Sequence, residues 1–114
     1  MRVVYMAHPV SGDVEGNLLR AERWMVWLQA VAFAPGHAVI APWLHELRVL
    51  RLSDQEPEAR ELALRRCEAV AALCDAVVLC GGRISEGMGR EARAARDVID
   101  LTGIGPMPPD GGGE

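Results

Sequence analysis

Short apolar runs that lack polar alternation are the feature that most constrains how this chain can fold. The segments RVVYMA (residues 2–7) and AVVLC (residues 76–80) are almost continuously apolar. A strand of this kind is expected where both faces of a sheet are covered, as in parallel sheets. After each run comes a turn containing Gly, Pro or Ser, and then a segment whose apolar residues recur at three- and four-residue steps. Such steps mark one face of a helix.

The alternation predicts four strands and three helices. Asn17, Ser53 and Ser85 are the expected N-caps of the helices, and residues 44–52 are either a short helix or a loop. The order strand, helix, strand, helix, strand, helix, strand predicts a small doubly wound α/β fold, flavodoxin- or Rossmann-like, with a parallel sheet and helices on both faces. The expected strands are residues 2–7, 37–43, 76–80 and 98–101, and the expected helical segments are residues 16–37, 53–75 and 85–97.

Length and composition narrow the class of protein. With 114 residues the chain is expected to form one domain, residues 1–104, followed by a disordered Gly- and Pro-rich tail, residues 105–114. The longest apolar runs fall short of a membrane span of ~20 residues, so no membrane partner is expected. The N-terminus carries no leader-like pattern, which predicts a cytoplasmic protein.

Charge and residue types exclude several activities. The formal net charge is −4 with no basic stripe, so nucleic acid is not an expected partner. All twelve basic residues are Arg, which excludes Schiff-base catalysis and a P-loop lysine. The three cysteines and three histidines fit no metal-ligand spacing. Reduced thiols, no metal and no cofactor are expected.

The predicted fold places the ligand site outside the carboxyl ends of its strands, at the loops HPVSGD (residues 8–13) and GGRISEG (residues 81–87). Ser85 and the first free N–H groups of the last helix are able to form an anion site, although Ser85 is equally suited to being only a cap. Gly87 lies one helical turn before Glu91 and leaves open space beside its carboxylate. A solvated surface glutamate is the alternative.

Four further residues are candidates near these loops. Tyr5 ends the first strand, where its phenol can reach a carboxylate or lie in the core. His8 and Asp13 follow in the first loop as substrate-binding candidates, with a turn residue and a helix cap as the alternatives. Trp43 follows the second strand and is either a core residue or a contact for a base.

Taken together, these residues resemble a known family. VVYMAHPVSGD is similar to the tyrosine-ended first strand and loop of nucleoside 2-deoxyribosyltransferases. The Ser-x-Gly-x-Gly-x-Glu pattern of CDAVVLCGGRISEGMGREA is especially similar to the 2′-deoxynucleoside 5′-phosphate N-hydrolases, and also resembles uncharacterised transferase-like proteins of bacteria and phages. Its residues are Ser85, Gly87, Gly89 and Glu91.

The resemblance implies an activity and site residues. Glu91 would be the nucleophile, oriented by Tyr5, in cleavage or transfer of an N-glycosidic bond by double displacement. Ser85, with Gly87 and Gly89 in the same motif, would hold the 5′ side of the sugar. The implied partner is a small-molecule nucleoside or nucleoside 5′-monophosphate, and the implied assembly is a homodimer or a higher homo-oligomer.

Cys67 departs from the family pattern. The family has an Asp eight residues before the Asp that precedes the third strand, and counting back from Asp75 gives Cys67. A neutral thiol is a poor proton donor to a departing base. The alternative functions are therefore a catalytically weakened nucleotide-binding module and an interaction protein that retains the fold. The segment GGRISEGMGRE also resembles the Gly-rich, Glu-containing motif of cytokinin-type phosphoribohydrolases. That alternative resemblance implies the same class of reaction, cleavage of an N-glycosidic bond.

Overall fold

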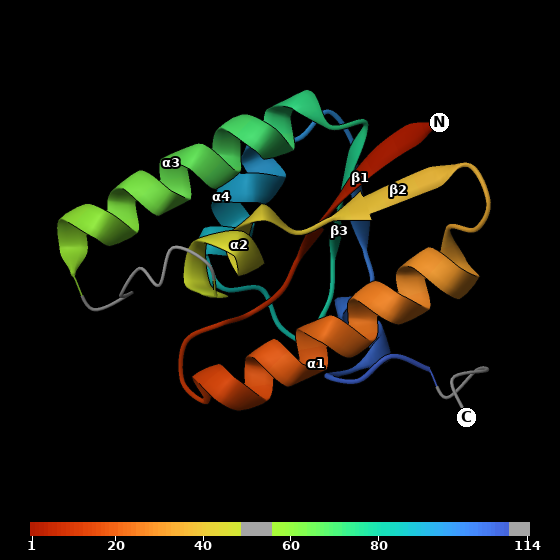
Figure 1. Cartoon of the computed structure of the whole chain (residues 1–114), viewed down its shortest axis with the longest axis horizontal. Helices are drawn as coiled ribbons and strands as arrows, with labels where there is room; N and C mark the ends of the chain where they lie inside the picture. The colour runs from red at the N-terminus through yellow and green to blue at the C-terminus, as the bar shows by residue number, and fades with distance from the viewer. Residues whose placement is uncertain (49–55, 110–114) are drawn as a thin grey trace.

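The computed structural model describes residues 1–48 and 56–109, which form one parallel sheet flanked by helices (Figure 1). The sheet has four strands in the order β2-β1-β3-β4, all parallel. The predicted α/β fold with a parallel sheet is confirmed. The strands are β1 (Arg2–Ala7), β2 (His37–Ile40), β3 (Ala76–Leu79) and β4 (Val98–Asp100).

Helices connect the strands and cover the sheet on opposite sides (Figure 1). Helix α1 lies on one side, while α3 and α4 pack against each other on the other side. The predicted N-cap Ser53 lies outside the described residues. The helices are α1 (Val14–Trp27), a π-helical turn η1 (Leu28–Ala32), α2 (Pro42–Arg48), α3 (Pro57–Leu73), α4 (Glu86–Ala94) and a 3₁₀ turn η2 (Thr102–Ile104).

The central strands form the core. All four residues of β3 are buried, as are the last four residues of β1. Val4 pairs with Ala76 and Ala7 with Leu79, so both strands end at the same edge of the sheet. This register brings the loops after β1 and β3 side by side. Apolar burial on both faces explains why these runs lack alternation.

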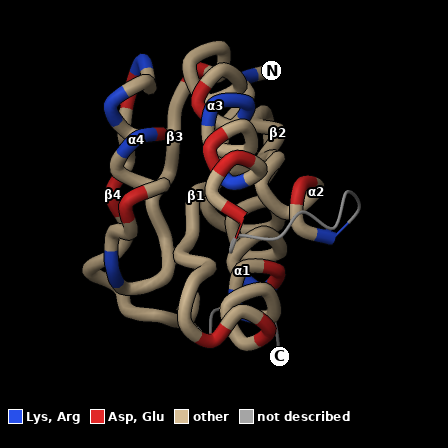
Figure 2. The backbone as a smooth tube through the Cα atoms, turned by 90° about the vertical axis from the view of Figure 1, so that its left-hand side faces the viewer, with Lys and Arg blue, Asp and Glu red and all other residues tan. Residues whose placement is uncertain are grey.

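Most of the charged residues in the described part of the chain lie on the helices. Acidic and basic residues are intermixed along α1, α3 and α4 (Figure 2). Glu86 and Arg90 stand four residues apart on α4, a spacing typical of a surface ion pair, but they do not pair with each other. Arg90 instead donates to Glu61, at 2.9 and 3.0 Å, and to Glu68, both on α3. Arg90 therefore fastens α4 to α3 rather than to its own first turn.

Several boundaries differ from the sequence prediction. The second strand ends at Ile40 rather than at residue 43, and Pro42 begins α2.

The N-cap of the first helix also differs from the prediction. Helix α1 is capped by Asp13 rather than Asn17, because the Asp13 side chain accepts from the Gly16 N–H at 3.1 Å. Asn17 is buried within α1 and donates to the Val10 and Ser11 carbonyls.

The start of the expected tail, residues 105–109, lies within the described residues. The Pro106 carbonyl accepts a hydrogen bond of 3.0 Å from the indole of Trp24, which is fully buried in α1. This part of the predicted tail packs on the domain, and residues 110–114 lie outside the described residues. None of the described helices combines the length and the apolar character needed to cross a membrane.

Candidate functional site

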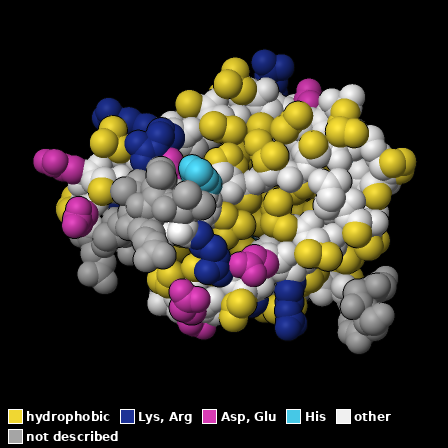
Figure 3. Space-filling view, in the orientation of Figure 1, with side chains coloured by type: hydrophobic (Ala, Val, Ile, Leu, Met, Phe, Trp, Pro, Cys, Tyr) yellow, Lys and Arg dark blue, Asp and Glu magenta, His cyan; other side chains and the backbone are white. Residues whose placement is uncertain are grey.

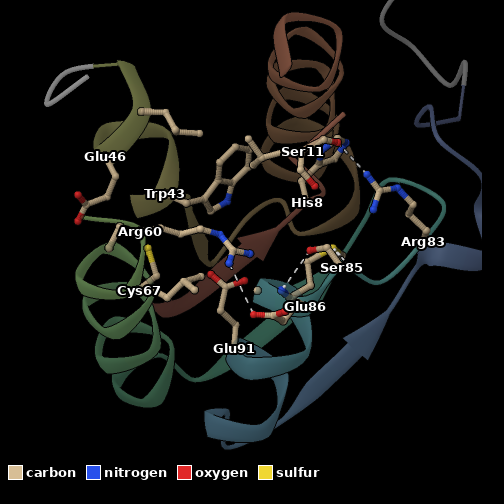
Figure 4. A pocket seen from close by; sticks show the side chains of 16 residues that line it. His8, Ser11, Trp43, Glu46, Arg60, Cys67, Arg83, Ser85, Glu86 and Glu91 are labelled. Atoms are coloured by element: carbon tan, nitrogen blue, oxygen red, sulfur yellow. Dashed lines mark hydrogen bonds and ion pairs between the residues drawn. The ribbon is translucent and has the colours of Figure 1, made fainter. Parts of the chain in front are cut away.

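A cavity of about 360 Å³ lies outside the carboxyl ends of β1 and β3 (Figure 4). Its walls come from the loop after β1, from α2, from α3 and from the start of α4. This is the place at which parallel α/β sheets bind ligands. The position follows from the shared strand register described above.

Glu91 and Tyr5 meet at this cavity. Glu91 lines it and is 5% exposed, and the fully buried Tyr5 hydroxyl donates a hydrogen bond to Glu91 Oε2. Burial raises the pKa of Glu91 to about 7, the Tyr5 hydrogen bond opposes that rise, and the Glu68 charge adds to it. Burial and the Glu91 charge hold the pKa of Tyr5 far above its ordinary value. Tyr5 is therefore a permanent donor to a carboxylate that titrates near neutrality.

Cys67 completes this group from helix α3. Its thiol lines the cavity, is 3% exposed and interacts with the Tyr5 hydroxyl. Burial, above all, raises the pKa of Cys67 to about 11. The thiol therefore keeps its proton across the physiological range.

The start of α4 forms the rim. Ser85 is the N-cap: its Oγ accepts from the Met88 N–H at 3.3 Å, as the sequence predicts. Because that bond uses an oxygen lone pair, the hydroxyl proton of Ser85 stays free to donate to a ligand. Gly87 also lines the cavity, and a Cβ built there would lie 3.2 Å from Leu64 Cδ2. The absence of a side chain at Gly87 thus allows α4 to pack closely on α3 and keeps this part of the cavity open.

Two rings line the cavity near β1. His8 and Trp43 lie nearly parallel, with ring centroids 6.2 Å apart and planes inclined by 14°. The Trp43 indole donates to the Met6 carbonyl at 2.8 Å, which fixes the ring. His8 Nδ1 lies 2.7 Å from the Pro9 carbonyl, an acceptor, so the proton is assigned to Nδ1. Burial lowers the pKa of His8, and its buried Nε2 has no partner among the described residues.

Sequence reasoning missed four charged residues that line the cavity, namely Glu46, Arg60, Arg83 and Glu86. Arg83 donates to the Ser11 carbonyl at 3.1 Å, and Arg60 lies 3.8 Å from Glu86. The sequence offered a signal for Arg83 and Glu86, because both lie within the predicted loop, residues 81–87. Glu46 lies in the segment for which the sequence predicts either a short helix or a loop, and placing Arg60 at the cavity required the tertiary position of α3.

Two predicted binding residues lie elsewhere. Asp13 is an exposed cap of α1 that lies 3.6 Å from Arg20, and it does not line the cavity. Gly89 faces Arg93 and does not line the cavity either. A helix turns about 100° per residue, so Gly89 points away from the surface that Gly87 presents. The other six predicted site residues line the cavity or, for Tyr5, contact a residue that does.

The described residues hold no group of three or more His, Cys, Asp or Glu side chains arranged to hold a metal. All three cysteines are buried free thiols. The groups available for chemistry are therefore a buried carboxylate, the phenol that donates to it, and a rim that carries guanidinium and hydroxyl groups.

The fold and this cavity define a small parallel α/β protein with an open cavity at the carboxyl edge of its sheet. Residues 2–99 match the model of a family described as a domain of unknown function, DUF7768, and the chain belongs to that family. Neither the curated proteins nor the solved structures contain a match to the chain.

Proposed function

We propose that this protein cleaves or transfers the N-glycosidic bond of a nucleoside or nucleoside 5′-monophosphate, with Glu91 as the nucleophile. The observation that carries the proposal is the hydrogen bond from the buried Tyr5 hydroxyl to Glu91 at the wall of an open cavity. Surface glutamates are common, but a buried carboxylate held by a phenol and facing a cavity is a candidate for chemistry.

The proposed reaction is a double displacement at the anomeric carbon. A Glu91 carboxylate oxygen bonds to C1′ as the C1′–N bond breaks and its electron pair leaves with the base. Water or a second base then attacks C1′ of the resulting ester, and the ester electrons return to Glu91. Tyr5 donates to the carboxylate throughout and orients the attacking oxygen.

The rim supports a substrate that is anionic at its 5′ side. Ser85 and the N-terminus of the nine-residue helix α4 face the cavity, and both attract anions. Arg83 extends along the same rim, and the structure gives it no carboxylate partner within 4 Å among the described residues (Figure 4). A 5′-phosphate would fit this end, while the Trp43 face suits the base.

The test is a chromatographic assay for free base, using a panel of nucleosides and their 5′-monophosphates. The wild-type protein should release base from at least one compound, and Glu91→Ala should abolish release. Glu91→Gln is the matched control, because it keeps the size and a hydrogen-bonding oxygen but lacks the nucleophilic charge. Unchanged activity in either variant, or no product from the whole panel, would contradict the proposal.

A second candidate is a nucleotide-binding module without turnover, and Cys67 is the observation that favours it. Its neutral thiol stands where the resemblance places an acid. A ligand that binds the folded state raises apparent stability, so thermal stabilisation by a nucleotide without any base release would favour this candidate. An interaction protein that only keeps the fold needs no open pocket, so the open cavity does not favour this alternative.

A further inference from the structure

The described side chains of the cavity do not include a free proton donor at neutral pH for a departing base, and this narrows the substrate class of the proposed function. When the C1′–N bond breaks, its electron pair goes to the ring nitrogen. A neutral heterocycle then leaves as an anion unless an acid protonates it, and such acid catalysis contributes roughly 10²- to 10⁴-fold to the rate. The question is which side chain at the cavity is able to supply that proton.

Glu46 forms an ion pair with Arg66. It is 7% exposed, and the Arg66 guanidinium donates to both of its oxygens, at 2.5 and 2.8 Å. Fork-to-fork pairing of this kind stabilises the ionised carboxylate, and it lowers the pKa of Glu46. Glu46 is therefore ionised, its charge is balanced by Arg66, and it supplies no proton to the cavity.

His8 is able to accept a hydrogen bond from a ligand but not to donate one. Its Nδ1–H donates a hydrogen bond to the Pro9 carbonyl, so the buried Nε2 presents a lone pair. Cys67 is buried beside Tyr5 and keeps its proton, which makes it a weak acid at neutral pH. Glu86 is exposed, and it lies 3.8 Å from Arg60 at the mouth.

The inner part of the cavity has two features that attract a cation, while Arg83 and Arg60 lie at its rim and mouth. Glu91 is a buried carboxylate that lines the cavity. The fixed ring of Trp43 lines the same cavity (Figure 4). A delocalised cation is attracted both by a carboxylate of low solvent exposure and by an indole face.

We infer that the substrates of this site are N-glycosides whose heterocycle already carries a positive charge, such as a pyridinium or 7-alkylpurinium nucleoside or its 5′-monophosphate. The inference rests on the proposed function of Glu91. As Glu91 bonds to C1′, the electron pair of the C1′–N bond neutralises the ring, and the base leaves as a neutral molecule with no proton required. Water then cleaves the ester, and its proton passes to solvent.

Matched substrate pairs test the inference. One pair is 7-methylguanosine 5′-monophosphate and guanosine 5′-monophosphate. The other is nicotinamide mononucleotide and its neutral dihydropyridine form. Rates are expressed relative to uncatalysed hydrolysis, because the cations are also more labile in water. The enhancement for the cation should exceed that for its neutral partner by about 10²-fold or more, the usual contribution of a missing acid.

The outcomes separate the two proposals. An equal or larger enhancement for the neutral partners would overturn the inference and leave the proposed function standing. Release of base from neither member of either pair would overturn the inference, and it would overturn the proposed function as well only if the whole panel of nucleosides and 5′-monophosphates also gave no base. Two variants of Cys67 test whether the missing acid explains the preference. Cys67→Asp should raise the rate on neutral substrates at least about tenfold. Cys67→Ser, which matches the thiol in size, should not raise it. A folded Cys67→Asp protein with no such gain would contradict the assignment, and the wild-type comparison stands if that variant fails to fold.

Discussion

At the scale of single residues, the proposed reaction depends on the ionisation state of Glu91, because only its carboxylate form is a nucleophile. Its carboxylate is buried, and only the Tyr5 hydroxyl offsets the cost of charging it. The pattern Ser-x-Gly-x-Gly-x-Glu was sufficient to single out Glu91 in the sequence. Its depth, its phenol partner and its titration near neutrality depend on residues 86 positions apart.

Tyr5→Phe should move the pH profile of the proposed reaction. The Tyr5 hydrogen bond lowers the pKa of Glu91, so its loss raises that pKa further above about 7. Since the nucleophile must be ionised, the acidic limb of the kcat/KM profile should shift to higher pH. Rates measured from pH 5 to pH 10 check this. A uniform loss of rate with an unmoved limb would mean that Tyr5 acts only in packing.

Glu91 should also make stability depend on pH. Its pKa is raised from 4.5 in the unfolded chain to about 7 in the fold. The folded state therefore keeps a proton that the unfolded chain releases, and stability falls as the pH rises from 4.5 to 7 and above. At 1.36 kcal/mol for each pKa unit the loss is about 3 kcal/mol.

Urea unfolding of the wild type and of Glu91→Gln at pH 4.5 and pH 8 measures this effect. The variant cannot ionise at this position, so its stability relative to the wild type should increase between the two pH values. Parallel pH dependence in the two proteins would show that Glu91 has an ordinary pKa.

At the scale of elements, the close packing of α4 against α3 sets the width of the cavity. Gly87 lies against Leu64, and Arg90 reaches both Glu61 and Glu68. The capping of α4 by Ser85 was readable from the sequence because caps are local. The partners of Arg90 were not, because they belong to another helix.

Two glycine variants of α4 separate packing from the site. Gly87→Ala should push Leu64 and narrow the cavity, which should weaken binding of a nucleotide and raise KM. A Cβ at position 89 would face the flexible end of Arg93. Gly89→Ala should therefore leave binding unchanged and stabilise the helix by up to about 1 kcal/mol. Ligand titrations and unfolding curves for both variants test this. Equal effects on binding would contradict the placement of the two glycines.

At the scale of the whole molecule, residues after the last strand contribute to the fold. Trp24 is fully buried, and its N–H is satisfied by the Pro106 carbonyl. Truncation after Ile104 should remove this hydrogen bond and lower stability by about 1 kcal/mol. Thermal unfolding measures the loss. In a Trp24→Phe background the same truncation should cost less, and an undiminished cost would assign the effect to other contacts.

Self-association is also a property of the whole molecule. Apolar side chains gather over the centre of the face seen in Figure 3, and Ala38 and Ile40 of the edge strand β2 are partly exposed. The homodimer or higher homo-oligomer implied by the family resemblance stays a prediction. Sedimentation equilibrium at several concentrations tests it, and a monomer at all of them would contradict it.

The sequence by itself determined the alternation of strands and helices, the parallel sheet and the capped helix that carries Glu91. These features depend on local patterns of burial and on short-range hydrogen bonds, which a single segment expresses. It misplaced Asp13 and Gly89 as binding residues and did not find Arg60 or Glu46. Only the tertiary structure decided which side chains share the cavity, that Tyr5 contacts Glu91, that Cys67 is buried beside them, and that Arg66 pairs with Glu46. Those facts arise from the register of β1 with β3 and the packing of α3 on α4, which join residues far apart in the chain.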